Sequence, residues 1–194
     1  TFEGKHFNLA NATCTIRPVQ QPHPPIWIAG NNDRVIRRAG QLGYPWFINP
    51  HATLDTLERQ MNIYRDGLSK GGKPMPEEMP IIKEMHIAPT HEEAVSTARP
   101  FLEEKYKAYA AWGQDKALPG QEDFTVPFDE LARDRFILGS AEEVIQQIED
   151  HHHRLGANHF MFRTWWPGMD ARHAYRSIEL MGDKVLPYFK DKYG

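Results

Sequence analysis

The chain has 194 residues, of which 40% are hydrophobic, 25% charged and 11% aromatic, and its formal net charge is -3 at pH 7. This composition is typical of a globular domain, and the length allows one domain with a sizeable core. The acidic balance argues against a nucleic-acid partner. The chain contains no apolar run of about 18 residues, so no membrane-spanning helix is predicted. Cys14 is the only cysteine, which excludes an internal disulfide and a cysteine zinc site and fits a cytoplasmic protein.

The first half of the chain predicts a strand, a helix and a second strand in close succession. The opening residues hold the segment FEGKHFNL and then a loop rich in proline and glutamine. An apolar strand is expected at 25–29, a helix at 32–42 and a second strand at 45–49. Gly43 fits the end of that helix. Two strands joined by a short helix form a βαβ unit, which implies a parallel sheet.

The same alternation continues to the end of the chain. Thr90 and Ser140 are predicted helix N-caps, because each is followed three residues later by the glutamate of a capping box. Residues 113–127 show no clear period and are interpreted as an inserted loop in a single domain, residues 1–194. The sequence therefore predicts an α/β fold with four strands, which is half of a (β/α)8 barrel in count or a small open doubly wound sheet. The remaining elements are expected as helices at 53–69, 91–112, 141–155 and 170–188, and strands at 79–90 and 157–168.

Gly30, Asn31 and Asn32 follow the first predicted strand and form a candidate anion site. Backbone N–H groups at a turn that opens a helix commonly bind phosphate. Arg34, one turn into the helix, could add a charge-assisted contact. The alternative is a simple turn with Arg34 in solvent.

Two later strands carry polar residues on one face. Glu84 and His86 share a face by the period of two, so Glu84 could orient His86 as an acid or base. Arg163 lies near the carboxyl end of the last strand, where an arginine could hold an anion. The alternatives are an ordinary structural pair, for example Arg163 with Glu84, and a core role for Trp165 and Trp166.

Other patterns point to structure rather than chemistry. The run of three histidines at 151–153 does not converge on one ion, because adjacent helical residues point in different directions. A solvated helix end is expected there, and no metal site is predicted. The aromatic face with Tyr106, Tyr109 and Trp112 is assigned to the core or to a subunit contact. No serine hydrolase elbow, Walker loop or dinucleotide fingerprint occurs.

An ordered set of segments resembles the C-terminal half of the bacterial luciferase-like family of flavin-dependent oxidoreductases and monooxygenases. The resemblance covers essentially the whole chain, and it rests on the order of the segments rather than on any one of them. It implies a TIM barrel of which this chain supplies strands five to eight with their helices. The segments are FEGKHFNL, PVQQPHPPIWIAG, RRAGQLGYPWF, APTHEEA, RFILGSAEEVIQQIEDHHHRLGANHFMFRTWWPGM and LPYF.

The resemblance also implies a cofactor and a site. The expected cofactor is reduced FMN, with the deazaflavin F420 as the alternative, and the expected chemistry acts on a small organic substrate. His86 and Arg163 are then the candidates for residues near the reacting substrate. The turn after the first predicted strand is implied to contact the flavin phosphate, although many relatives have serine where Asn31 stands. The matching positions are Ala29, Gly30, Asn31, Asn32 and Arg34.

One departure from the family is large, because strands one to four have no counterpart here. A half barrel has two open sheet edges, which invite pairing with another copy or with a missing N-terminal half. The chain alone is expected to be inactive, and a homo-oligomer or a completed barrel is expected to be the working form. The alternative is a non-catalytic truncated half barrel, or an assembly partner without cofactor. A small doubly wound binding domain would be distinguished by its strand order.

Overall fold

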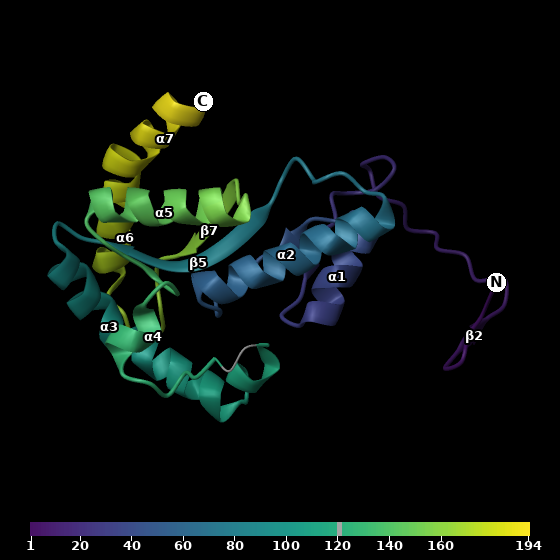
Figure 1. Ribbon diagram of the computed structural model, residues 1–194, viewed down its shortest axis with the longest axis horizontal. Helices are drawn as coiled ribbons and strands as arrows, with labels where there is room; N and C mark the ends of the chain where they lie inside the picture. Colours follow the sequence, from purple (N-terminus) through teal and green to yellow (C-terminus); the bar gives the residue numbers. More distant parts are fainter. Residues whose placement is uncertain (120–121) are drawn as a thin grey trace.

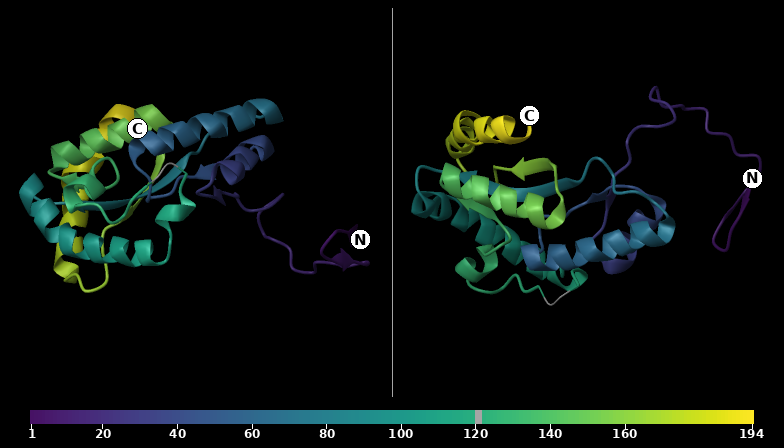
Figure 2. Two further views of the ribbon diagram at one scale, coloured as in Figure 1. Left: turned by 60° about the horizontal axis from the view of Figure 1, so that its bottom comes forward. Right: turned by 45° about the horizontal axis from the view of Figure 1, so that its top comes forward.

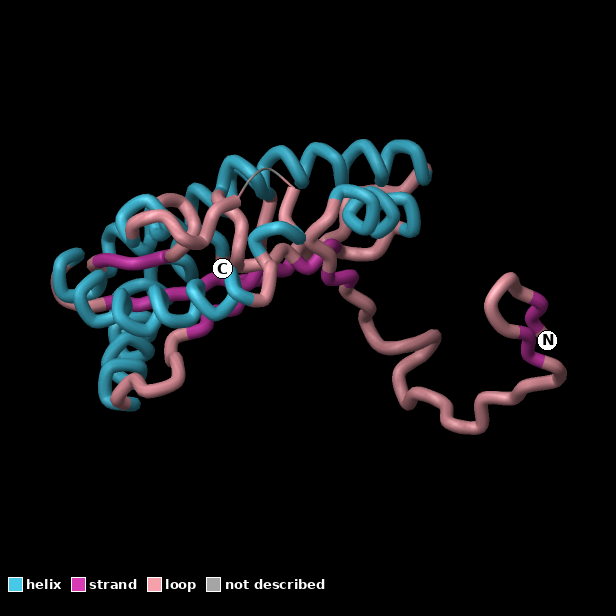
Figure 3. The backbone as a smooth tube through the Cα atoms, turned by 90° about the horizontal axis from the view of Figure 1, so that it is seen from below, coloured by secondary structure: helices cyan, strands magenta, loops and turns pink. Residues whose placement is uncertain are grey.

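The computed structural model describes residues 1–119 and 122–194. Its parallel strands form one narrow layer between helices (Figure 1, Figure 3). The strands are β3 (Ile28–Ala29), β4 (Trp46–Phe47), β5 (Pro80–Ile87), β6 (Ile137–Gly139) and β7 (His159–Arg163).

Four of the parallel strands follow one another in chain order, as the strands of a barrel do, whereas β6 lies on the other side of β5 from β7. β3 pairs with β4, Ile48 beside β4 bridges to Ile81 of β5, and β5 pairs with β7, all in parallel. A doubly wound sheet reverses its order at a switch point, whereas barrel strands add one after another. The order therefore favours a barrel segment. The described strands form an open sheet and do not close.

β6 is a strand that the sequence did not predict. Residues 128–139 lie between the predicted elements, and they form the short helix α4 (Phe128–Ala132) and then β6. Ile137 pairs with Met85, and Gly139 pairs with Ile87, at the carboxyl end of β5. A strand of three residues is too short to show a period of its own.

The helix ends agree closely with the predicted signals. Asn32 caps α1 by accepting a hydrogen bond from the Val35 N–H at 3.0 Å. Ser140 and Glu143 form both bonds of the predicted capping box at α5, and Thr90 supplies its half of the box at α3. The helices are α1 (Asp33–Leu42), α2 (Leu54–Gly71), α3 (His91–Ala111), α5 (Ala141–Leu155), α6 (Ala171–Leu180) and α7 (Leu186–Tyr193), with a π-helical turn (Met181–Val185) between the last two.

α1 and α2 pack closely because glycines lie at their contact. A Cβ on Gly40 would collide with the backbone carbonyl of Tyr64, and one on Gly67 would collide with that of Arg37. Glycine inside a helix costs about 1 kcal/mol relative to alanine. The close approach of two backbones explains why these positions carry glycine.

The two faces of β5 have different neighbours. Met85 and Ile87 point to one face and pack in a buried cluster with Val144 and Ile148 of α5. Glu84 and His86 point to the opposite face, as the period of two requires. There α3 reaches the strand, and the Lys105 ammonium binds the Glu84 carboxylate.

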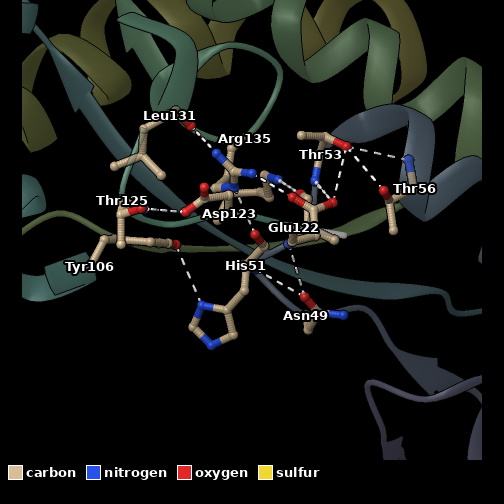
Figure 4. A network of polar contacts seen from close by, with 12 residues as sticks. Asn49, His51, Thr53, Thr56, Tyr106, Glu122, Asp123, Thr125, Leu131 and Arg135 are labelled. Carbon is tan, nitrogen blue, oxygen red and sulfur yellow. Dashed lines mark hydrogen bonds and ion pairs between the residues drawn. The ribbon is translucent and has the colours of Figure 1, made fainter. Parts of the chain in front are cut away.

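A buried ion pair holds the predicted inserted loop against the body (Figure 4). Residues 113–127 contain a 3₁₀ turn (Asp115–Ala117), and residues 120–121 lie outside the described part. The Glu122 carboxylate binds the Arg135 guanidinium, with both side chains 4% exposed. It also accepts a hydrogen bond from the Thr53 hydroxyl at 3.2 Å. The loop is thereby attached to the N-terminus of α2.

The N-terminal residues form an extended arm that leaves the body (Figure 2). At its end lies an antiparallel hairpin of β1 (Phe2–Glu3) and β2 (Asn8–Leu9). The arm exposes apolar side chains, among them Phe7, Ile16 and Val19. Among the described residues, none of the helices has the length and apolar character required to cross a membrane.

Removal of Glu122 tests the buried ion pair. Glu122→Ala should lower the free energy of unfolding by about 3–5 kcal/mol, because the Arg135 charge would stay buried without its carboxylate. Urea unfolding measures the loss. The matched control is Glu103→Ala, which breaks a half-exposed pair with Arg99 and should cost less than about 1 kcal/mol. Equal losses in the two variants would contradict a special role for the buried pair.

Candidate active site

Polar side chains gather at the carboxyl ends of the parallel strands. His51 follows β4, Glu84 and His86 lie in the second half of β5, and Arg163 ends β7. Parallel strands bring these ends to one edge of the sheet, which is the active-site edge of barrel enzymes. The structure thus brings His86 and Arg163, the two residues proposed from the sequence, to the same edge.

Glu84 is the centre of this group. Its side chain is fully buried, and each of its oxygens has a donor. Arg163 Nη1 lies 2.7 Å from Oε1, the Trp166 indole Nε1–H donates to Oε2 at 2.7 Å, and Lys105 Nζ binds Oε1. The alternative weighed from the sequence, an Arg163–Glu84 pair, is therefore what the structure shows. Trp166 is buried in the core, while Trp165 is 49% exposed.

The group around Glu84 carries an excess of positive charge. Two cations, Lys105 and Arg163, face one carboxylate. Burial lowers the pKa of Lys105, although Glu84 opposes this effect. The Lys105 side chain is 13% exposed, whereas Arg163 is 37% exposed and keeps part of its guanidinium open to a ligand.

His51 and an aromatic row lie beside this charge. The His51 Nδ1 is 3.4 Å from the Tyr106 hydroxyl, and its ring meets the Tyr109 ring edge-on at 5.1 Å. Burial, and next the Lys105 charge, lower the pKa of His51 to about 4. His51 is therefore neutral at pH 7 and adds no charge to the site.

The predicted pairing of Glu84 with His86 is wrong. The two side chains share a face, but the Glu84 oxygens are taken by the two cations and by the Trp166 indole. A carboxylate gains more from cationic donors than from a neutral imidazole. His86 is 3% exposed, and its Nδ1 has no hydrogen-bond partner among the described residues. Burial lowers its pKa to about 4.

The turn at Gly30–Asn32 has a fixed backbone orientation. The Trp46 indole N–H donates to the Gly30 carbonyl at 3.0 Å, and the Gln60 side chain donates to the Asn31 carbonyl at 2.8 Å. In a trans peptide the N–H points opposite to the C=O. The N–H groups of Asn31 and Asn32 therefore point away from the core. Ala29 and Arg34 are exposed on either side of the turn.

The first helical residue after this turn bears on anion binding. Asp33 begins α1 and would repel an anion, but Arg59 binds it with two nitrogens at 2.9 and 3.0 Å. The acidic charge at the helix N-terminus is thus compensated within the structure. The turn follows β3, whereas Glu84 is a residue of β5. Because β4 lies between these two strands, it separates the turn from the group around Glu84.

Sequence reasoning missed Lys105 and His51. Lys105 lies in mid-helix among other charged residues and gives no local signal. His51 follows a strand end, and a polar residue at that position is a usable signal in a parallel sheet.

The prediction of a solvated histidine run is wrong for His151. This residue is buried, its Nδ1 donates to the Gln147 carbonyl at 2.7 Å, and burial lowers its pKa to about 3. In the part of the chain that the structure describes, no three His, Cys, Asp or Glu side chains are placed to hold a metal ion.

Comparison with known families and curated proteins gives a consistent result. The family model described as luciferase-like monooxygenase matches residues 1–159. The oxygenase component of a flavin-dependent trigonelline monooxygenase from Acinetobacter baylyi is 24% identical to this chain. The alignment is 202 residues long and covers 97% of this chain and 55% of that protein. The chain spans about half the length of the curated relatives it matches.

Solved structures share the fold at low sequence identity. Monooxygenase RslO1 from Streptomyces bottropensis matches with a TM-score of 0.75 at 22% identity, over 97% of this chain and 55% of that one. The oxygenating constituent of 3,6-diketocamphane monooxygenase from Pseudomonas putida, in complex with FMN, matches with a TM-score of 0.63 at 20% identity, over 85% and 49%. An F420-dependent secondary alcohol dehydrogenase matches with a TM-score of 0.67 at 20% identity, over 96% and 55%.

The buried histidines predict how stability changes with pH. Burial lowers the pKa of His86 to about 4, so between pH 6.5 and 4 the unfolded chain binds a proton that the folded chain excludes. This contribution is present above pH 6.5 and is lost as the pH falls to 4, and it amounts to up to about 3 kcal/mol.

Urea unfolding at pH 7.5 and 4.5 measures this effect. His86→Gln should reduce the loss of stability between the two pH values, because the variant has no proton to exclude at this position. His6→Gln, in the exposed arm, is the control and should leave the loss unchanged. If His86→Gln lost as much stability between the two pH values as the unsubstituted protein does, His86 would not contribute to the pH dependence.

Proposed function

Because the chain belongs to the luciferase-like monooxygenase family, we propose that it forms part of a flavin-dependent oxidoreductase or monooxygenase acting on a small organic substrate. The observation that carries the proposal is the Gly30–Asn32 turn, whose outward N–H groups lie at a strand end and open a helix. We further propose that the chain supplies strands five to eight of a barrel. The sequential order of β3, β4, β5 and β7 supports this assignment.

The proposed cofactor is FMN, with F420 as the alternative, and both share the phosphate that the turn would hold. The N–H groups of Asn31 and Asn32 would donate to this phosphate, and Arg34 would add a charge. The turn fits a phosphate because its carbonyls face the core. Trp46 donates to the Gly30 carbonyl and Gln60 to the Asn31 carbonyl, which leaves the N–H groups on the opposite side. When bound, the flavin supplies the hydride or oxygen chemistry.

The substrate is proposed to lie near His86 and Arg163. His86 is neutral at pH 7, so its imidazole would accept or relay a proton rather than act as a cation. Arg163 would orient the substrate with the part of its guanidinium that Glu84 does not engage. Trp166 is fully buried beside Glu84, and its indole N–H donates to the carboxylate at 2.7 Å.

The working form is proposed to contain more than this sheet. The outer edges of β3 and β7 have no strand beside them among the described residues, and open edges pair readily with other strands. The remaining strands of a barrel would complete both edges. We also propose that the complete protein is a homo-oligomer.

Flavin titration tests the proposed phosphate site. FMN should bind more tightly than riboflavin, which lacks the phosphate, as measured by quenching of flavin fluorescence. Arg34→Ala should weaken FMN binding by about tenfold, the effect of losing one charged hydrogen bond, and should leave riboflavin binding unchanged. Arg38→Ala, one turn further along α1 and also exposed, is the matched control.

A parallel titration with F420 separates the two cofactors. Binding of F420 in preference to FMN would reassign the cofactor and keep the site. Binding of neither would contradict the proposal and favour the non-catalytic alternative, a half barrel that serves as an assembly partner. Equal affinity for FMN and riboflavin would show that the phosphate is held elsewhere.

A further inference from the structure

A stripe of α3 places a cation and two aromatic rings side by side. Lys105, Tyr109 and Trp112 are spaced i, i+4 and i+7, so they lie on one face of the helix and its end. Lys105 Nζ is 5.4 Å from the centre of the Tyr109 ring, and the Tyr109 and Trp112 rings are 5.8 Å apart. Trp112 is 71% exposed, although the sequence assigned this face to the core or to a subunit contact.

Among the described residues, the positive charge at the Lys105 end of this stripe exceeds the negative charge that faces it. Lys105 and Arg163 both bind one oxygen of Glu84, and the other oxygen takes the neutral Trp166 indole. One positive charge is left over, shared between Lys105, which is 13% exposed, and Arg163, which is 37% exposed. His51 next to Tyr109 is neutral at pH 7. Lys105 is largely removed from water, so an anion that binds there compensates a charge whose burial is costly.

From this arrangement we infer that Lys105 and Arg163 bind the carboxylate of the substrate, and that Tyr109 and Trp112 pack against an aromatic ring attached to it. The substrate class is thus a small aromatic carboxylate. The inference rests on the proposed function, because it assigns the ligand of the same site. It adds Lys105, Tyr109 and Trp112 as residues that determine specificity.

The chemistry of the group favours a carboxylate over a neutral ligand. A guanidinium and an ammonium on one side of an oxyanion form charge-assisted hydrogen bonds, which are about twice as strong as neutral ones. Glu84 fixes the positions of both donors, so little side-chain entropy is lost when the ligand binds. A phosphate could use the same donors, and the experiment has to separate it from a carboxylate.

The experiment is a ligand titration followed at the Trp166 indole N–H by NMR. This proton donates to Glu84 and reports any change in the group. The 194-residue chain is titrated with benzoate, with the neutral isostere benzamide, with acetate and with inorganic phosphate. Benzoate should shift the Trp166 signal and saturate, benzamide should bind at least tenfold more weakly, and acetate should bind more weakly because it lacks the ring.

Variants assign the effect to residues. Lys105→Met and Arg163→Met should each weaken benzoate binding by about tenfold or more, and each leaves Glu84 with one cation and the indole as partners. Lys107→Met removes an exposed charge from the same helix and should leave benzoate binding unchanged. Trp112→Ala should weaken benzoate and leave acetate unchanged.

The outcomes separate this inference from the proposed function. FMN affinity, measured on the same samples, should be unchanged in Lys105→Met. Benzoate binding without any flavin binding would support the carboxylate site and contradict the cofactor. Equal binding of benzoate and benzamide, a loss in Lys107→Met as large as that in Lys105→Met, or phosphate binding tighter than benzoate binding would each overturn the inference.

Discussion

The burial of the Glu84 carboxylate is the constraint on which the arrangement of the site depends. A carboxylate without access to water must be paired and hydrogen bonded, because its desolvation is otherwise too costly. Its three donors come from different parts of the chain: Lys105 from α3, Arg163 from the end of β7 and Trp166 from the loop that follows. One side chain of β5 therefore fixes the position of a helix and of a neighbouring strand end.

The buried pair of Glu122 and Arg135 has the same role at another place in the fold (Figure 4). Arg135 Nε also donates to the His51 carbonyl at 2.8 Å, so the pair fixes the loop after β4 as well. This loop carries the His51 ring to its position beside Tyr109. Two ion pairs, each bridging segments that are not adjacent in sequence, thus set the geometry of the carboxyl edge.

These long-range contacts mark the limit of what the sequence alone could predict. The caps at Asn32 and Ser140 and the helix end at Gly43 were predictable, because each depends on residues within one turn. The strand order could be expected only from the family resemblance and not from local patterns. Lys105 gave no signal at all, because it lies 21 residues from Glu84 among other charged residues of its helix. The expected pairing of Glu84 with His86 was wrong for the same reason. The sequence shows that the two residues share a face of one strand, but it does not show that Lys105 and Arg163 compete for the carboxylate.

Lys83 and Lys105 lie on opposite faces of β5, and their ammonium groups have different partners. Lys83, on the face opposite Glu84, is fully buried, and its ammonium donates to the Ala52 carbonyl at 3.4 Å. Burial, and next the Arg135 charge, lower its pKa to about 7, and the Glu84 and Glu122 carboxylates oppose this shift. Lys105 has a carboxylate partner, which opposes its desolvation. Two cations therefore meet one carboxylate on the Glu84 face of β5, at the edge where the strand ends converge.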